Sequence, residues 1–260
     1  MRRILLTNDD GISSPGLAAM RRHLEGLGEV FTIAPTVNRS AIARSITIER
    51  RLHAERVVFG GRFEGVAIDG TPVDCVRAAT LGLFCEAPDL VVAGINLGPN
   101  MGEDVTYSGT VGAALEGALL GIPGVAVSIA GRQPRHLDEV TALALPILAR
   151  VAETGLPSRT ALNVNLPDLP VAEVTGVEVT RLGLASYQER LEVETSNGRS
   201  HAYTVHSEQR ESHHEPGTDF AAVAAGAVSV TALTTDWRDA AATQVVAGWG
   251  LATAVLRRRS

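Results

Sequence analysis

The segment Arg3–Gly28, RILLTNDDGISSPGLAAMRRHLEGLG, decides the fold because it joins a short apolar run to an amphipathic helical pattern. The run RILLTN has the length and apolar character of a buried strand. Ser14 can cap a helix that begins at Pro15, and leucine and methionine side chains then recur at helical spacing. The sequence therefore predicts a helix over Pro15–Gly28, with Gly28 at its C-terminal stop.

The same alternation of strand and helix continues along the chain. Further apolar runs are EVFTIAP, DLVVAGIN, GVAVSIA and ALNVNLP, and helical patterns cover Thr71–Phe84, Thr110–Ile122 and His136–Thr154. Short, nearly continuous apolar strands between helices are typical of a parallel sheet covered on both faces. We therefore predict one α/β domain over residues 1–260, in which residues 37–70 form shorter strands and a hairpin near the sheet edge.

Residues 184–217 have a different character, because apolar and polar side chains alternate there and few large apolar residues occur. The tripeptide SNG inside this segment is a hairpin turn signal. We expect a protruding β-hairpin arm that packs against a second subunit, since an isolated hairpin is only marginally stable. The tail over residues 240–260 is predicted to be a C-terminal helix.

Composition excludes several classes of protein. All 23 basic residues are arginine, which excludes a Schiff-base lysine, a Walker A lysine and a Ser–Lys dyad. The net charge of −6 argues against a surface that coats a nucleic-acid duplex. No apolar run is long enough to span a membrane, and the N-terminal run is too short for a secretory signal, so we expect a cytoplasmic protein. Cys75 and Cys85 lie ten residues apart in an expected helix, too far apart for a disulfide, so we expect two buried thiols.

Oxygen-bearing side chains follow three of the predicted strands. Asp9 and Asp10 follow the first strand, and Ser40 follows the second. Asn96 follows the strand expected at Asp89–Ala93. Ligands of open parallel sheets bind beyond the carboxyl ends of the strands. Two neighbouring carboxylates repel each other, which a cation relieves, and hard oxygen donors favour Mg²⁺ or Mn²⁺ over Zn²⁺. The alternative is that NDDG is an ordinary turn before a helix.

The segment Gly94–Thr110, GINLGPNMGEDVTYSGT, is expected to be a long loop that buries almost nothing itself. Its last residues, YSGT, open a helix whose amide groups and dipole suit a phosphate. The alternative is an ordinary N-cap by Ser108. A cation site beside an anion site indicates metal-assisted chemistry on a phosphoryl group.

Other kinds of site have weaker support. The chain has no G-x-S-x-G elbow and no G-x-G-x-x-G after its first strand, so the usual signatures of a serine esterase and of a dinucleotide site are missing. The histidine pair in Ser212–Glu215, SHHE, is better explained as a solvated loop than as a transition-metal site. A non-catalytic nucleotide- or phosphate-binding regulator on the same scaffold stays open as an alternative function.

Several blocks of the sequence resemble the SurE survival-protein family of 5′/3′-nucleotidases. They are ILLTNDDGISSPGL, IAPTVNRSA, DGTPVDCV, DLVVAGINLGPNMGEDVTYSGTVGAALEG and GIPGVAVS, with NVNLP and GTDFAAVAAGAVSVTAL further on. The resemblance implies a Rossmann-like core, a metal-dependent phosphatase of nucleoside 5′- and possibly 3′-monophosphates, and a homodimer or homotetramer with an exchanged arm.

The resemblance also implies a set of site residues. One divalent ion, Mg²⁺ or Mn²⁺, would be held by Asp9, Asp10, Ser40 and Asn96, with Asp9 and Asp10 as the catalytic residues. The phosphate pocket would add Asn8, Asn96, Ser108, Gly109 and Thr110. Two features depart from the family pattern. Ala41 and Ala43 stand where the family often has glycine and serine, and the 184–217 arm lacks much of its aromatic, glycine-rich pattern.

Overall fold

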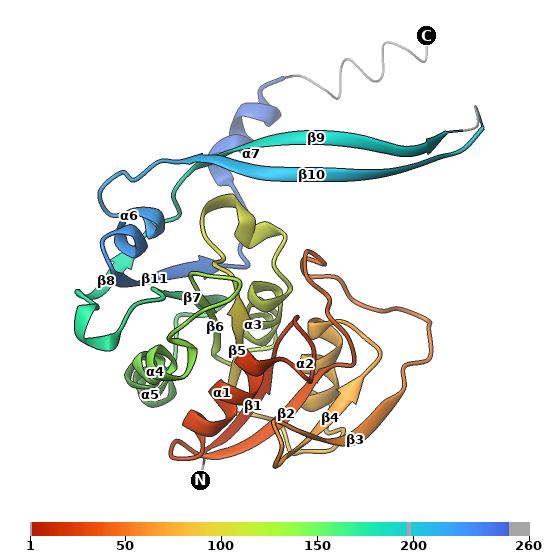
Figure 1. Ribbon diagram of the computed structural model, residues 1–260, viewed down its shortest axis with the longest axis vertical. Coiled ribbons are helices and arrows are strands. Elements are labelled where there is room, and N and C mark those ends of the chain that lie inside the picture. The colour runs from red at the N-terminus through yellow and green to blue at the C-terminus, as the bar shows by residue number, and fades with distance from the viewer. Residues whose placement is uncertain (1, 197–198, 250–260) are drawn as a thin grey trace.

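The computed structural model describes residues 2–196 and 199–249, and its centre is a nine-stranded, mostly parallel sheet (Figure 1). The strand order is β3-β4-β2-β1-β5-β6-β7-β11-β8, with antiparallel pairing only at β3–β4 and β7–β11. The strands are β1 Arg3–Thr7, β2 Glu29–Pro35, β3 Ala54–Phe59, β4 Phe63–Ile68, β5 Leu90–Leu97, β6 Gly124–Ile129, β7 Thr160–Leu166, β8 Gly176–Thr180 and β11 Ala227–Thr234. This arrangement confirms the predicted α/β fold.

Helices cover both faces of the sheet. They are α1 Pro15–Leu24, α2 Pro72–Thr80, α3 Gly109–Leu119, α4 Leu137–Thr141, α5 Leu145–Thr154, α6 Asp219–Ala224 and α7 Ala240–Ala247, with 3-10 turns η1 Gly102–Thr106, η2 Ala142–Ala144 and η3 Val171–Glu173. Neighbouring residues of a strand point to opposite faces. Ile4 and Leu6 of β1 therefore pack in one apolar cluster with α1, α4 and α5, whereas Leu5 packs in another with α2 and α3.

Helix α1 begins as the sequence predicts and ends earlier. The Ser14 hydroxyl accepts a hydrogen bond from the Gly16 N–H at 3.2 Å, and Pro15 occupies the first helical position. The helix ends at Leu24, so the prediction that it continues to Gly28 was wrong. The Leu27 N–H instead donates to the Leu24 carbonyl in a turn that leads into β2.

Two other predicted helices differ from the observed ones. The segment His136–Thr154 is divided into α4, η2 and α5, with a proline in the first turn of α5. The helix expected over Thr71–Phe84 is the shorter α2, which Thr71 and Asp74 begin with a capping box. Both cysteines are free thiols, but Cys85 lies outside the helix and is only partly buried, so the prediction of a buried helical thiol was wrong for Cys85.

The predicted interruption over residues 37–70 contains the edge hairpin of the sheet. Strands β3 and β4 pair antiparallel from Ala54–Ile68 to Phe59–Phe63, and β4 joins β2 in parallel. The preceding residues, 37–53, have no regular structure and carry Ser40 over the end of β1. The edge hairpin thus leaves the carboxyl ends of β1, β2 and β5 adjacent in the middle of the molecule.

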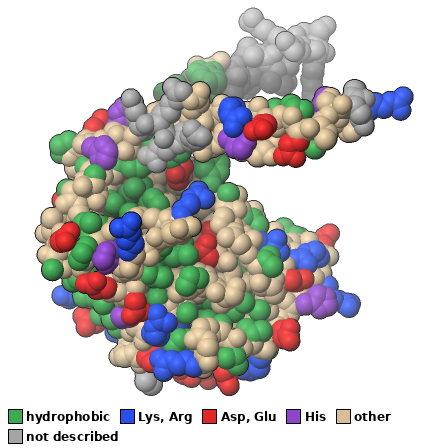
Figure 2. All heavy atoms as spheres, in the orientation of Figure 1, with side chains coloured by type: hydrophobic (Ala, Val, Ile, Leu, Met, Phe, Trp, Pro, Cys, Tyr) green, Lys and Arg blue, Asp and Glu red, His purple; other side chains and the backbone are tan. Residues whose placement is uncertain are grey.

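The predicted arm is a two-stranded antiparallel sheet that projects from the body (Figures 1 and 2). Its strands are β9 Ala185–Ser196 and β10 His201–Ser212. The turn predicted at SNG falls partly on residues 197–198, outside the described residues. Helix α7 lies at the start of the predicted C-terminal helix over residues 240–260, and residues 250–260 lie outside the described part of the chain.

Within residues 2–196 and 199–249, no helix has the length and apolar character required to cross a membrane.

Candidate active site

A cavity of about 510 Å³ lies at the carboxyl ends of β1, β2 and β5. It brings together Asp9, Ser40, Asn96 and Ser108, which come from four separate segments of the chain. The described residues that line it are Asp9, Ser40, Ala41, Asn96, Leu97, Gly98, Pro99, Asn100, Asp104, Tyr107, Ser108, Arg132, Tyr187 and Ser207. The expectation that these strand ends form one polar site agrees with this geometry.

Asp9 is fixed by the first turn of α3. Its side chain is only 3% exposed, and its carboxylate accepts hydrogen bonds from the Gly109 N–H at 3.1 Å and the Thr110 hydroxyl at 2.5 Å. Gly109 must lack a side chain, because an added Cβ would lie 2.8 Å from the Cβ of Asp9. A carboxylate at this position also meets the positive end of the helix dipole.

Burial raises the pKa of Asp9, although the hydrogen bonds from Thr110 and Gly109 oppose the rise. Burial likewise raises the pKa of Asp10, the N–H of Leu97 lowers it, and the neighbouring charge of Asp9 raises it further. Two acidic groups with raised pKa values form an environment that a bound cation would stabilise.

Asp10 does not line the cavity. Its carboxylate accepts the Leu97 N–H at 3.1 Å, which ties the turn after β1 to the end of β5 beside Asn96. The turn itself is built by Asn8, whose side chain accepts from the Gly11 N–H at 3.2 Å and donates to the Gly11 carbonyl at 3.0 Å. Gly11 has φ +98°, a conformation that favours glycine. Asn8 is completely buried, and it shapes the turn that presents Asp9.

Ser40 and Asn96 line the cavity from the irregular segment after β2 and from the end of β5. The Asn96 side-chain nitrogen donates to the Gly98 carbonyl at 2.8 Å, which orients its amide. The Ser40 N–H donates to the Asn38 side chain at 2.7 Å. Ala41 and Ala43, the two departures from the family pattern, have φ values of 58° and 56°. A left-handed conformation is strained for alanine and free for glycine.

Ser108 is the N-cap of α3, so the alternative explanation of YSGT holds for this residue. Its hydroxyl oxygen accepts the Val111 N–H at 3.1 Å. The Gly109 amide and the Thr110 hydroxyl already donate to Asp9. In this structure, therefore, the first turn of α3 directs donors at the carboxylate that faces the cavity, and Ser108 is the member of this group that lines the cavity itself.

The prediction that Gly94–Thr110 is a long loop that buries almost nothing was wrong. Strand β5 continues to Leu97, and η1 occupies much of the remainder. Ile95 is completely buried, and Met101 and Val105 are also buried. The segment is therefore part of the core, and its rigidity positions Asn96 and Ser108.

Buried asparagines hold this segment in place, and the sequence analysis missed their role. The Asn100 N–H donates to the Asn165 side chain at 2.8 Å, and the Asn100 carbonyl accepts from Asn163 at 2.8 Å and from Asn165 at 3.0 Å. The signal was present in NVNLP, because two asparagines two residues apart in a buried strand point to the same face.

Three further cavity residues were also missed. Arg132, after β6, is the one basic side chain among the lining residues. Tyr187 of the arm donates its hydroxyl to the Asp104 carboxylate at 2.5 Å, and Tyr107 is 64% exposed beside it. Sequence could not group these residues, since η1, the arm and the loop after β6 are far apart in the chain and come together only in the fold.

The donor set fits a hard cation and does not fit a zinc-type cluster. Oxygens of Asp9, Ser40 and Asn96 face one cavity, with the carboxylate of Asp10 next to Asn96. Across the described residues, no three histidine, cysteine or acidic side chains are grouped where they could hold a metal ion. The SHHE segment gives no such group either: the Ser212 hydroxyl and His214 ring interact at 2.7 Å in the exposed arm.

Comparison with known proteins places this arrangement in a family. A family model described as "Survival protein SurE" matches residues 4–189. The chain belongs to the SurE family. A SurE relative from Rubrobacter xylanophilus is 46% identical, over 98% of this chain and all of that protein, and one from Methylococcus capsulatus is 44% identical, over 90% and 91% respectively.

Both of these SurE relatives carry the name 5′-nucleotidase SurE. The crystal structure of the SurE protein from Aquifex aeolicus shares the fold, with a TM-score of 0.78 and 42% identity over 91% of this chain and 95% of that one. The family resemblance seen in the sequence blocks is thus confirmed along nearly the whole chain.

Proposed function

We propose that this SurE family member is a metal-dependent phosphatase that hydrolyses nucleoside 5′-monophosphates, and also 3′-monophosphates, to nucleoside and inorganic phosphate. The names of its relatives support the 5′ activity. The observation that carries the proposal is the convergence of Asp9, Ser40 and Asn96 on one cavity beside the N-terminus of α3. Two adjacent carboxylates would repel an anionic ligand unless a cation lies between them, which supports metal-dependent chemistry over binding alone.

Asp9, Asp10, Ser40 and Asn96 would hold one divalent ion, Mg²⁺ or Mn²⁺. Such an ion supplies charge neutralisation at the phosphoryl group and lowers the pKa of a bound water. Asp9 would be held in place for this task by Gly109 and Thr110. The second carboxylate, on Asp10, would orient the attacking water or accept its proton.

The phosphate would lie against the first turn of α3 and Arg132. Ser108 accepts the Val111 N–H with its oxygen, which leaves its own hydroxyl hydrogen to donate into the cavity. Arg132 adds a guanidinium, a donor suited to phosphate oxygens. Asn8, Gly109 and Thr110 would then support phosphate binding through the position of Asp9.

The decisive experiment measures phosphate release from a panel of nucleoside 5′- and 3′-monophosphates. Activity should disappear in EDTA and return when Mg²⁺ or Mn²⁺ is added. Binding of a nucleoside monophosphate without any phosphate release, with metal present, would favour the non-catalytic alternative.

We also propose that the chain assembles as a homodimer or homotetramer through the arm. Apolar side chains on both arm strands are more than half exposed, among them Leu191 at 58% and Tyr203 at 58%. Exposed apolar groups on an extended hairpin favour burial against another subunit. Light scattering should give a multiple of the chain mass for the wild type and a smaller mass for Leu191→Glu. A wild-type monomer would contradict the proposal.

A further inference from the structure

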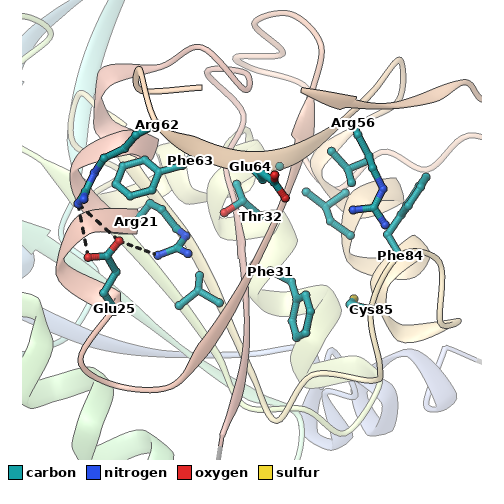
Figure 3. Close-up of a pocket in the computed structure, with 14 residues that line it drawn as sticks. Arg21, Glu25, Phe31, Thr32, Arg56, Arg62, Phe63, Glu64, Phe84 and Cys85 are labelled. Carbon is teal, nitrogen blue, oxygen red and sulfur yellow. Dashed lines mark hydrogen bonds and ion pairs between the residues drawn. The ribbon is translucent and has the colours of Figure 1, made fainter. Parts of the chain in front are cut away.

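A second cavity of about 480 Å³ lies at the opposite end of the sheet from Asp9 (Figure 3). Strands β2 and β4 pair only from Ile33–Val66 to Pro35–Ile68, so their amino-terminal ends separate. The cavity occupies this separation. One wall comes from α1, which covers one face of the sheet, and the other comes from the segment after α2, on the other face.

Guanidinium groups stacked on phenylalanine rings form both walls of this second cavity. On one side, the guanidinium carbons of Arg21 and Arg62 lie 5.1 and 4.6 Å from the centre of the Phe63 ring. On the other side, Arg56 lies 5.3 Å from the centre of the Phe84 ring (Figure 3). Stacking orients a guanidinium so that its N–H edge stays available to a ligand.

The positive charges of the walls are only partly neutralised within the described chain. Glu25 serves both Arg21, at 3.6 Å, and Arg62, at 3.4 Å. Arg56 forms no ion pair with any described residue. Glu64 is the other acidic group in the lining, so the cavity carries three positive and two negative side chains.

Behind the lining of this cavity, three side-chain polar atoms are buried from solvent and have no hydrogen-bond partner among the described residues. They are Nε and Nη1 of Arg21 and the hydroxyl oxygen of Thr32. A buried polar group without a partner costs about 1–3 kcal/mol, and more when it is charged. Burial also lowers the pKa of Arg21, which is the expected response of a cation that is removed from water. Nη1 of Arg21 lies 3.6 Å from Glu25, and the remaining nitrogen, Nη2, is not among these buried atoms and stays open to a ligand.

The lining selects a ligand with three different parts. Guanidinium N–H groups suit a phosphate, and flat rings stack on arginine and phenylalanine. The carboxylate of Glu64, which has no ion pair or side-chain hydrogen bond within the described chain, suits the hydroxyl groups of a sugar. We propose that this cavity is a second, non-catalytic site for a nucleoside monophosphate. The phosphate lies at Arg21 and the base lies at Arg56 and Phe84.

Isothermal titration of the full chain with AMP in EDTA tests this site directly, because EDTA removes the ion on which the catalytic site is proposed to depend. We expect metal-independent binding that Arg21→Gln and Arg56→Gln each weaken at least about tenfold, which is 1.4 kcal/mol. Arg22→Gln is the matched control, since Arg22 lies on the same helix, outside the cavity, and pairs with Asp138. AMP should also bind more tightly than inorganic phosphate or adenosine.

Three results would overturn the second site. They are no binding in EDTA, binding that neither Arg21→Gln nor Arg56→Gln changes, and inorganic phosphate that binds as tightly as AMP. Arg56 lies on the exposed edge strand, so its substitution tests the site even if the loss of Arg21 disturbs folding. Phosphate release with metal reports on the catalytic site alone, so failure of one proposal is distinguishable from failure of the other.

Discussion

The carboxyl ends of β1, β2 and β5, called here the cavity end of the sheet, and the β9–β10 arm differ in how the chain stabilises their polar groups. At the cavity end, Asp9, Thr110 and Asn100 are buried, and each makes hydrogen bonds to other parts of the same chain. The arm is exposed on both sides, and a side-chain hydrogen bond from Tyr187 to Asp104 ties it to the body.

This difference shows which parts of the site are fixed by the fold. The carboxylate of Asp9 is held by the core of the chain, because Leu5 of β1 and Ala113 of α3 pack in one apolar cluster. Tyr187 and Ser207 enter the cavity from an element with little buried surface. We therefore expect substitutions at the cavity end to have large effects on activity and substitutions in the arm to have small ones.

The largest effect is expected for Asp9→Asn. This change removes a charge that a divalent ion would need, which is worth several kcal/mol, so phosphate release should fall about 10³-fold or more. Circular dichroism should show an intact fold, because asparagine has the shape of aspartate and its one side-chain oxygen can still accept from either Thr110 or Gly109. Wild-type turnover with ample Mg²⁺ or Mn²⁺ would contradict the role of Asp9.

Thr110→Val tests whether the first turn of α3 positions Asp9. Valine has nearly the same shape but cannot donate to the carboxylate, and a hydrogen bond to a charged group is worth about 1.5–3 kcal/mol. We expect kcat to fall by about one to two orders of magnitude, while Thr110→Ser, which restores the hydroxyl, retains most of the activity. Equal activity of the valine and serine variants would show that the hydrogen bond has no role.

Substitution of Asp74 tests how the irregular segment that carries Ser40, residues 37–53, is stabilised. Burial alone would raise the pKa of Asp74, but hydrogen bonds from Thr47 and Thr71 outweigh burial and lower the pKa. A lowered folded pKa stabilises the protein above the unfolded value, near 3.9, and this stability is lost as the pH falls through the folded pKa.

Asp74→Asn should therefore reduce the free energy of unfolding by about 1.5–3 kcal/mol at pH 7. The difference from the wild type should shrink as the pH falls below about 4. Urea denaturation at several pH values measures this difference. A difference that stays constant down to low pH would mean that the charge of Asp74 contributes nothing.

The smallest effect is expected for Tyr187→Phe in the arm. Burial and the Asp104 carboxylate both raise the pKa of Tyr187, so its hydroxyl remains a hydrogen-bond donor. This bond lies at the exposed arm, so we expect its loss to raise KM at most about tenfold, which is 1.4 kcal/mol. Tyr203→Phe on β10 is the control and should leave KM unchanged. A loss of activity as large as that of Asp9→Asn would show that the arm takes part in chemistry.

The sequence predicted the elements whose signals are local. Ser14 and Pro15 begin α1, alternating apolar strands indicate a parallel sheet, and the strand ends therefore lie side by side. The same pattern predicts that Asp9, Ser40 and Asn96 share one site, and all three line one cavity.

Sequence alone could not predict how polar groups pair across the fold. Gly109 and Thr110 were expected to face a phosphate, yet their donors reach Asp9, about a hundred residues away in sequence. The segment Gly94–Thr110 was expected to bury little, because its glycines and asparagines are typical of loops. Hydrogen bonds from Asn163 and Asn165 allow this polar segment to be buried.

The central claim is that one divalent ion binds in the cavity lined by Asp9, Ser40 and Asn96, with Asp10 beside it as a further ligand. A Mn²⁺ titration followed by electron paramagnetic resonance counts bound ions directly and does not depend on activity. We expect one ion per chain for the wild type and for Arg22→Gln, and none for Asp9→Asn. An Asp9→Asn chain that binds Mn²⁺ as tightly as the wild type would contradict the account.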